Sequence, residues 1–568
     1  MAFHQGVKVT NFQPGVEESV KTHYDVIVVG AGMGGIYAVH RFRKDGLSVL
    51  GIEAAPEVGG VWYHNAYPGA RVDVESYDYC YFFDQDLYSD WTWTERYAAQ
   101  PEILRYLNYA ADRLQVKPSI LFNTWVNGSQ WDPDTHRYVV TTDTGKTFTA
   151  RYLVMATGNL SKPRKPDFAG IDEFKGEWHQ SAHWPRTPVQ IAGRRVAVIG
   201  TGSSGVQAAT AIAKEASELY VFQRTANYSV PAHNREADQE RHRRYSSKTE
   251  TIWKELTESG GGIILPPVLG KAGDYTEEQQ QQLLEERWAF GGQALLGLFA
   301  DQGTDQAVND IVSNFVRGKV RQMVKDPETA EKLMPTSYPI GVRRLCIDTG
   351  FYDIFNQENV TLVDVNADPI TRITPTGIQA GDNHYEVDLI VFALGFEAFT
   401  GALDNANIRN EHGQQPSDLW KRGPRTYLGL MTAGFPNLFT LTGPLSPSVL
   451  ANMNAANVQH VDFIADMISH MNERGLTRVE PTEEGQQAWM DHAASLAKPL
   501  LRLAHDNYMV HVNKDDGSRV FVPYSGGFNK YVDQCNEVVA AGYRGFAFDA
   551  VRDEAGELTE PVASAHAQ

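Results

Sequence analysis

Two segments of the chain combine an apolar run, a glycine-rich turn and an amphipathic stretch. In the first, apolar residues at 24–29 lead through GAGMGG to helical spacing at 36–46 and a second apolar run at 48–54. In the second, RRVAVIGTGSSG at 194–205 leads through an amphipathic stretch to an apolar run at 218–224. A buried strand, glycine turn, helix and strand within such a length predict a βαβ unit. The sequence therefore predicts an α/β fold with two doubly wound, Rossmann-like dinucleotide-binding domains.

A polar stretch with helical spacing separates the parts of the chain that are rich in predicted strands. Residues 232–335 are rich in Glu, Gln, Lys and Arg, which predicts a helical insertion, and strands return at 385–396. We expect the following division: an N-terminal arm at 1–23, a first nucleotide-binding domain at 24–153 and 397–550, a second at 154–231 and 336–396, the insertion at 232–335, and a flexible tail at 551–568.

The composition excludes several classes of protein. The 568 residues include 51 basic and 70 acidic ones, a net charge of -19, which argues against a nucleic-acid binder or a partner of anionic membranes. Cys80, Cys346 and Cys535 form no C-x-x-C pair, so neither a disulfide scaffold nor a metal site is expected. No apolar run approaches the roughly 18 residues of a membrane span, and residues 1–22 lack the apolar core of a secretory signal. These features predict a cytoplasmic protein, for which a monomer is plausible.

The first glycine turn has the pattern of a dinucleotide site. Gly30, Gly32 and Gly35 form G-x-G-x-x-G directly after a predicted strand, and Glu53 ends the next strand. The glycines allow a tight turn, a close approach of pyrophosphate and close packing of helix on strand, and the carboxylate accepts ribose hydroxyls. The alternative interpretation is a plain glycine turn followed by an exposed glutamate.

The second turn repeats the glycines but not the acid. Gly200, Gly202 and Gly205 occupy the same positions, while the end of the following strand carries Gln223 and Arg224. A carboxylate would repel a 2′-phosphate, whereas an arginine binds it through charge-assisted hydrogen bonds. The pattern predicts NADP here, unless Arg224 is an ordinary surface arginine. Two such sites without a dithiol indicate a flavoprotein that takes hydride from NADPH and passes electrons to dioxygen.

Two further motifs resemble those of the flavin-dependent Baeyer–Villiger monooxygenases. The segment GGVWYHNAYPGARVD fits the family pattern at Gly60, Trp62, Tyr67, Pro68, Gly69 and Asp73. The segment FKGEWHQSAHWP fits the family fingerprint at Phe174, Gly176, Trp184 and Pro185, but has Gln180 in place of the fingerprint histidine. The resemblance runs from about residue 24 to 548 and is strongest to the phenylacetone and cyclohexanone monooxygenase branch.

The resemblance implies a reaction and the residues that carry it. It implies FAD in the first domain and NADPH in the second, with one oxygen atom inserted beside a ketone carbonyl through a flavin peroxide to give an ester or lactone. Arg344 matches the active-site arginine of the family, with Asp73 as its carboxylate partner. Arg343 matches a position that contacts the NADP 2′-phosphate, and Trp62 with Gly60 would lie beside FAD.

The same comparison places a substrate loop at 442–453, where Val449, Leu450 and Met453 would line the ketone pocket; apolar residues in such a run serve equally well as core. Two positions depart from the family. Gln180 hydrogen-bonds but carries no charge, so we expect a working enzyme with altered coupling, measured by its turnover and its release of peroxide. Asn507, within 504–519, stands where relatives have a tryptophan in a loop over NADP.

Two other functions are compatible with the glycine turns. One is a flavin monooxygenase that oxidises sulfur or nitrogen, which the motifs at 59–73 and 174–185 disfavour. The other is a weakly catalytic sensor that binds FAD and NADPH, which the changes at Gln180 and Asn507 permit. The presence of both Asp73 and Arg344 argues against a sensor, because a binding protein has no need of an oxyanion site.

Overall fold

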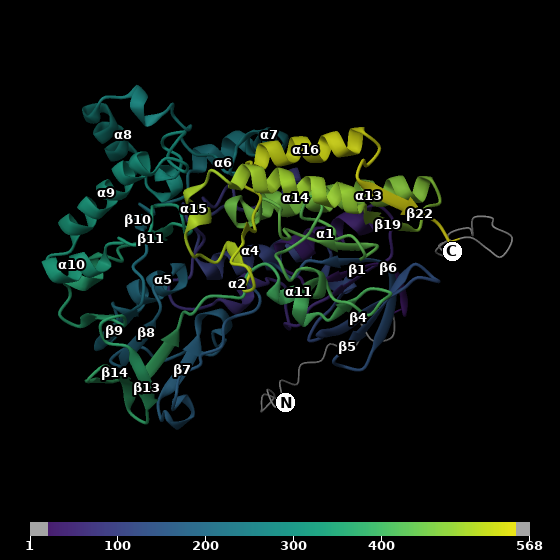
Figure 1. The fold of residues 1–568 in the computed structure, drawn as a ribbon. Helices are drawn as coiled ribbons and strands as arrows, with labels where there is room; N and C mark the ends of the chain where they lie inside the picture. The colour runs from purple at the N-terminus through teal and green to yellow at the C-terminus, as the bar shows by residue number, and fades with distance from the viewer. Residues whose placement is uncertain (1–20, 552–568) are drawn as a thin grey trace.

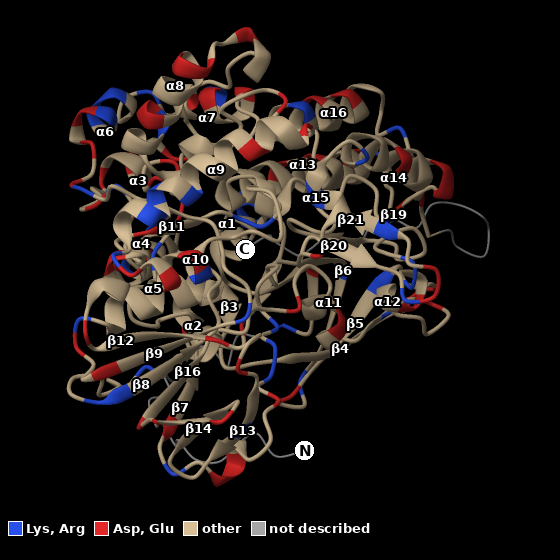
Figure 2. Ribbon diagram, turned by 60° about the vertical axis from the view of Figure 1, so that its left-hand side comes forward, with Lys and Arg blue, Asp and Glu red and all other residues tan. Residues whose placement is uncertain are grey.

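The computed structural model describes residues 21–551. The expected flexible tail, apart from Val551, and the part of the expected N-terminal arm before residue 21 lie outside these residues. Within 21–551 no helix is long and apolar enough to cross a membrane. Figure 1 shows two sheets side by side below a layer of helices. Figure 2 shows acidic and basic residues interspersed over the sheets and the helices.

The first sheet combines strands from both ends of the chain. Its order is β17-β4-β5-β6-β1-β2-β3, and β18 adds to β6. The βαβ pattern around the first glycine turn forms as expected, with β1 parallel to β2 and β6, while β4, β5 and β6 are antiparallel. β6 continues past the domain boundary expected at residue 154. The strands are β1 (His23–Val29), β2 (Val49–Ile52), β3 (Ile120–Leu121), β4 (Val126–Asp132), β5 (Arg137–Thr142), β6 (Thr147–Met155), β17 (Ile408–Arg409) and β18 (Leu438–Thr440).

The second sheet is wholly parallel and has the order β12-β9-β8-β16-β7. Parallel strands buried on both faces require near-continuous apolar sequence, which β8 and β16 have. The strands are β7 (Glu177–Gln180), β8 (Arg195–Ile199), β9 (Glu218–Gln223), β12 (Val360–Asp364) and β16 (Leu389–Phe392), and helix α5 (Ser203–Ile212) follows β8.

The strands expected at 385–396 belong to two different sheets. β15 (Asn383–Glu386) joins the antiparallel sheet of β13 (Ile370–Thr374) and β14 (Gly377–Ala380), whereas β16 belongs to the parallel sheet. Asp388 marks the break, since its carboxylate accepts the backbone N–H of Arg195 at 3.0 Å and pairs with the Arg195 guanidinium at 2.8 Å.

The segment expected as an insertion is helical and contributes to the cores of both domains. Its α-helices are α6 (Gln239–Tyr245), α7 (Thr249–Glu258), α8 (Glu277–Phe290), α9 (Gln306–Met323) and α10 (Pro327–Leu333). Leu256 and Val312 are buried in the core of the first domain, whereas Val320 and Leu333 are buried in the core of the second. The insertion therefore bridges the two nucleotide-binding domains (Figure 1).

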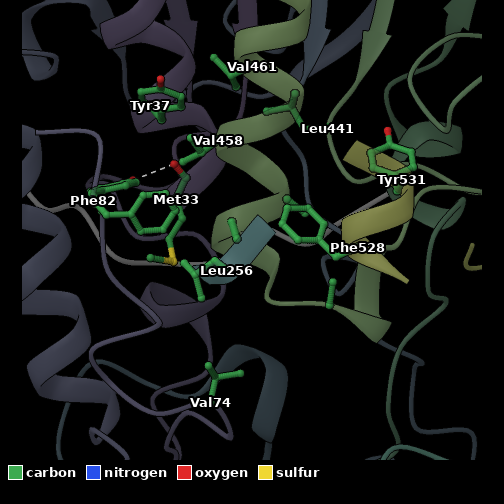
Figure 3. Packing of buried hydrophobic residues seen from close by; sticks show 14 of the residues in the cluster. Met33, Tyr37, Val74, Phe82, Leu256, Leu441, Val458, Val461, Phe528 and Tyr531 are labelled. Carbon is green, nitrogen blue, oxygen red and sulfur yellow. Dashed lines mark hydrogen bonds between the residues drawn. The ribbon is translucent and has the colours of Figure 1, made fainter. Parts of the chain in front are cut away.

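Helix α13 (Met453–Glu473) is the central helix of the first domain. It packs on α1 (Met33–Lys44), and Figure 3 shows Val458 near Met33 and Tyr37 of α1. The same core includes Phe528 and Tyr531 of α16 (Phe528–Ala540). A helix buried on most sides is apolar around much of its circumference, as here.

The remaining elements connect these layers. They are α2 (Val61–His64), α3 (Gln85–Ser89), α4 (Gln100–Arg113), β10 (Ser229–Pro231), β11 (Cys346–Asp348), α11 (Gly401–Asn405), α12 (Pro416–Leu419), β19 (Arg478–Pro481), α14 (Glu483–Ala497), α15 (Leu501–Ala504), β20 (Val510–Val512), β21 (Arg519–Phe521) and β22 (Phe546–Asp549).

Candidate active site

The first glycine turn has the geometry that its sequence predicts. Gly30 has a φ of 104°, which side chains rarely adopt, and a Cβ on Gly35 would lie 1.9 Å from the Gly30 carbonyl oxygen. Gly32 precedes α1, and no side chain caps this helix. A Cβ on Gly60 would lie 2.9 Å from the Gly32 Cα, so glycine at both positions lets the backbones approach. The free N–H groups at the start of α1 fit a pyrophosphate.

Glu53 lies beside this turn at the end of β2. Its carboxylate is buried and accepts the backbone N–H groups of Ala31 at 2.6 Å and Ala55 at 2.8 Å. Burial raises the pKa of Glu53, although the hydrogen bonds from the backbone oppose this rise. Each carboxylate oxygen keeps a lone pair, so Glu53 can still accept ribose hydroxyls as the sequence predicts.

The second turn repeats this geometry. Gly200 has a φ of 108°, and a Cβ on Gly205 would lie 1.9 Å from the Gly200 carbonyl oxygen. A Cβ on Gly202 would meet nothing within 4 Å, and no side chain caps α5, which begins at the next residue. The open space at Gly202 and the uncapped helix fit the pyrophosphate of a second dinucleotide.

The residues expected to bind the 2′-phosphate lie near the end of β9. The buried Gln223 side chain donates a hydrogen bond to the Lys332 carbonyl at 2.7 Å. Arg224, the next residue, is exposed just beyond the end of the strand. The guanidinium of Arg343 lies 4.8 Å from the ring centre of Tyr338, whose hydroxyl donates to Asn227 in the segment after β9. Nε of Arg343 is buried without a hydrogen-bond partner among residues 21–551, as expected of a group that awaits a ligand.

The motif at 59–73 crosses from the first domain to the second. Tyr67 donates a hydrogen bond to Oε1 of Gln207 on α5 at 2.8 Å, and Nε2 of Gln207 donates to the Arg71 carbonyl at 3.1 Å. A Cβ on Gly69 would lie 2.5 Å from the Gln207 carbonyl oxygen, which explains the glycine. These contacts place Asp73, at the end of the motif, between the two domains.

Asp73 meets Arg344 in a two-pronged ion pair. Nε of Arg344 donates to one carboxylate oxygen at 2.6 Å and Nη2 donates to the other at 2.8 Å, while Nη1 donates to the Val449 carbonyl. Burial opposes the charge of Arg344, but Asp73 more than offsets it, so the pKa of Arg344 lies above its ordinary value. The structure thus joins the motif at 59–73, the arginine segment and the expected substrate loop at one point.

The loop at 442–453 is held in a strained conformation. Thr442, Leu445 and Ser448 have φ values of 50°, 66° and 47°, which cost energy for residues other than glycine. Asn159 donates to the Thr442 carbonyl at 3.0 Å and to the Ser448 hydroxyl at 2.5 Å. The Thr442 N–H donates to buried His460 at 2.9 Å. A loop fixed by so many contacts fits a site that needs a defined shape.

The three residues expected to line the ketone pocket have different surroundings. The Val449 side chain is buried in a small apolar cluster with Phe399 and Phe521, and Leu450 is half-buried against it. Met453 is half-buried at the start of α13. Val449 is thus core through its side chain and part of the site through its carbonyl.

The fingerprint at 174–185 links the second sheet to α2. A Cβ on Gly176 would lie 2.5 Å from the Phe174 ring, and the Trp184 N–H donates to the His64 carbonyl at 3.1 Å. Trp184 and Pro185 also line a cavity of about 630 Å³ against α4. Gln180 ends β7 and donates to the Arg164 carbonyl at 3.3 Å.

The comparisons with known proteins agree with this geometry. Residues 27–251 match the family described as pyridine nucleotide-disulphide oxidoreductase. The structure titled oxidized steroid monooxygenase bound to NADP is 44% identical with a TM-score of 0.89, and covers 93% of this chain and 100% of that chain. The Baeyer-Villiger monooxygenase of Pseudooceanicola batsensis is 38% identical over 96% of this chain and 99% of its own length.

This chain belongs to the Baeyer–Villiger monooxygenase family. A third relative of similar identity bears a different activity in its name: the phenazine N-monooxygenase of Lysobacter antibioticus is 37% identical over 93% of this chain and 97% of its own length. The heteroatom alternative therefore has a representative among the relatives.

Trp62 of this Baeyer–Villiger monooxygenase is a core residue of α2. It is buried, its ring contacts Tyr79 edge to face with centroids 5.9 Å apart, and its N–H donates to the Tyr79 hydroxyl at 3.1 Å. A flavin contact for Trp62 stays a prediction. The pKa of half-buried His64, which lies near the fingerprint, is lowered to about 4, chiefly because the ring is partly removed from water. No group of three His, Cys, Asp or Glu within 21–551 could hold a metal ion.

Tyr508 is a residue that the sequence did not single out. Asn507 completes a local turn, since it donates to the Arg502 and His505 carbonyls at 2.9 Å, so its side chain serves the backbone. The neighbouring Tyr508 ring stacks on Phe399 with centroids 6.4 Å apart. A tyrosine in a polar stretch was the available signal, but spacing alone does not show what such a residue faces.

Proposed function

We propose that this chain is an FAD-containing monooxygenase that uses NADPH and dioxygen to convert a ketone into an ester or lactone. One oxygen atom enters between the carbonyl carbon and its neighbour, the other leaves as water, and NADPH supplies the two electrons. The observation that carries the proposal is the ion pair of Arg344 and Asp73 between two dinucleotide turns. An ion pair held at that point by both domains suits a reaction that needs both cofactors.

Each glycine turn fits one cofactor. FAD would lie on Gly30 and Gly32 with its ribose at Glu53, in a domain assigned to 24–153 and 397–550. NADPH would lie on Gly200 and Gly202, in a domain assigned to 154–231 and 336–396, with its 2′-phosphate near Arg224 and Arg343. When bound, FAD reduced by NADPH supplies the activated oxygen. The open space at Gly202 and the buried, unpartnered Nε of Arg343 support this assignment.

Arg344 stabilises negative charge on oxygen during transfer to the carbonyl. A guanidinium keeps its charge at every working pH, and in a partly buried site its field is weakly screened. Asp73 and the Val449 carbonyl hold its Nε, Nη1 and Nη2 atoms, which fixes the direction of the remaining N–H bonds. Asp73 is in turn tied to the insertion, since its carbonyl accepts a hydrogen bond from Gln293 at 2.9 Å.

The ketone would lie beside the loop at 442–453, with Leu450 and Met453 in contact. The direct test is NADPH oxidation in air with and without ketone. We expect a rate that rises with the ketone and exceeds the rate of peroxide release; equal rates of NADPH loss and peroxide release with every ketone would contradict the proposal.

Oxidation of nitrogen or sulfur is the second candidate, favoured by the phenazine N-monooxygenase among the relatives. A panel containing an aromatic N-heterocycle and a sulfide beside the ketones separates the two. A heteroatom oxide as the main product, with ketones untouched, would replace the first proposal. A sensor without turnover is disfavoured by the intact Arg344–Asp73 pair.

We also infer that the enzyme works in a reducing compartment such as the cytoplasm, with small-molecule partners only. Cys80, Cys346 and Cys535 are all free and buried, and burial raises the pKa of each thiol to about 12, which keeps it unreactive. A monomer agrees with this proposal, and sedimentation of the holoenzyme would test it.

A further inference from the structure

Arg502 lies at the edge of the apolar cluster beside which the ketone is expected. Its guanidinium carbon is 5.8 Å from the ring centre of Phe521, which is buried in the same cluster as Val449. A Cβ on Gly341 would lie 3.7 Å from Nη2 of Arg502. The guanidinium therefore also reaches the segment that leads into Arg344.

The charge of Arg502 is unbalanced. Its guanidinium forms neither an ion pair nor a hydrogen bond with residues 21–551, and it lies instead over the Phe521 ring. The acid nearest in sequence, Asp506, pairs with Arg519 at 2.9 Å. Burial without a carboxylate partner lowers the pKa of Arg502, although the guanidinium stays protonated. A partly buried cation without a partner is costly, and an anionic ligand would relieve that cost.

The apolar cluster beside Arg502 also contacts the catalytic pair. Val449, whose side chain belongs to that cluster, accepts a hydrogen bond from Nη1 of Arg344 through its carbonyl. The exposed Tyr508 ring stacks on Phe399 of the same cluster. One cluster thus borders both the unpaired arginine and the paired one.

We propose that Arg502 binds a carboxylate carried by the ketone substrate, so that the enzyme favours keto acids over neutral ketones of the same shape. The planar guanidinium presents two parallel N–H groups to a carboxylate, which gives direction as well as attraction. Arg344 remains the group for the reacting carbonyl, and Arg502 recognises the far end of the substrate. This inference rests on the proposed function, whose reaction it leaves unchanged.

The test compares each keto acid with its methyl ester, for example 5-oxohexanoate and 7-oxooctanoate, in the holoenzyme. We expect wild type to have a higher kcat/KM for at least one acid than for its ester. Arg502→Met should lower that acid-to-ester ratio by about tenfold or more, as loss of a charge-assisted hydrogen bond does. Arg502→Lys should keep most of the preference. Arg474→Met, which removes an exposed arginine at the end of α13, is the matched control and should change nothing.

Two outcomes would overturn the inference: equal use of acid and ester by wild type, or an unchanged acid-to-ester ratio in Arg502→Met, whether or not the KM for NADPH rises. If Arg502→Met does not fold, salt dependence in wild type decides, because added salt should lower kcat/KM for the acid alone. A wild type that forms ester from no ketone contradicts the proposed function itself, whereas equal use of acid and ester contradicts only this inference.

Discussion

Arg344 and Asp73 lie 271 positions apart in the chain, yet two N–H groups of the guanidinium meet the two carboxylate oxygens at 2.6 and 2.8 Å. The geometry is that of a bidentate pair, which restricts orientation more than a single contact. The Val449 carbonyl takes a third bond from the same guanidinium. Three segments that converge on one cation make its position a property of the whole fold.

Arg344→Ala should separate the two halves of the reaction. Reduction of FAD by NADPH should continue, because the glycine turns are intact, while ester formation should fall by about a hundredfold or more as for other lost oxyanion contacts. Rapid-mixing absorbance without oxygen measures the first step, and product analysis in air measures the second. Asp73→Asn, which removes only the charge of the partner, should lower ester formation less. Full ester formation by Arg344→Ala would remove Arg344 from the mechanism.

Arg224→Ala should change the choice of nicotinamide cofactor. If Arg224 binds the 2′-phosphate, KM for NADPH should rise by about 10- to 100-fold, the range of a lost hydrogen bond to a charged group. KM for NADH, which lacks that phosphate, should change little. Steady-state kinetics with both cofactors measure this, and an equal loss for both would mean that Arg224 acts on the fold.

Gly202→Ala tests the second turn without disturbing the fold. A Cβ there meets nothing within 4 Å and the backbone is extended, so the melting temperature should stay near that of wild type. The new methyl group would occupy the space expected for pyrophosphate, so the affinity for NADPH should fall by about tenfold. Gly318→Ala, at an equally open glycine in α9, is the control and should leave the affinity unchanged.

His460 should make stability depend on acid pH. It accepts the Thr442 N–H through Nδ1, and its Nε2 contacts the Tyr531 hydroxyl at 3.0 Å, so it is held neutral in the core. Burial lowers its pKa from 6.5 to about 3. Because the pKa of His460 is lower in the folded protein, the unfolded chain binds a proton at a higher pH than the folded protein does. The stability that neutral His460 contributes is therefore fully present above about pH 6.5 and is lost as the pH falls toward 3.

The measurable consequence is a difference between wild type and His460→Gln. The free energy of unfolding of wild type should exceed that of the variant by about 2 kcal/mol less at pH 5 than at pH 7. This follows because each pH unit below the unfolded pKa changes the free energy by about 1.4 kcal/mol. Thermal unfolding of both holoproteins at the two pH values measures this. A constant difference in melting temperature would show that His460 is not the titrating group.

How much the sequence could predict depends on the range of each interaction. The glycine turns follow from local backbone requirements, so the βαβ units could be predicted from residues close together in the chain. The meeting of Asp73 and Arg344 came from family resemblance, since spacing does not encode contacts between distant segments. The contact of Arg344 with the Val449 carbonyl and the place of Tyr508 depend on tertiary packing. The break at Asp388 was hidden because apolar residues flank it on both sides.

Product analysis by gas chromatography and mass spectrometry tests the central claim most directly. Purified enzyme with FAD, NADPH and air would receive cyclic, linear and aryl ketones, with Arg344→Ala in parallel. The proposed function predicts an ester or lactone one oxygen atom heavier than its ketone, formed by wild type and formed more slowly by the variant, by about a hundredfold or more. Consumption of NADPH with only peroxide formed, for every ketone and with both proteins alike, would contradict it.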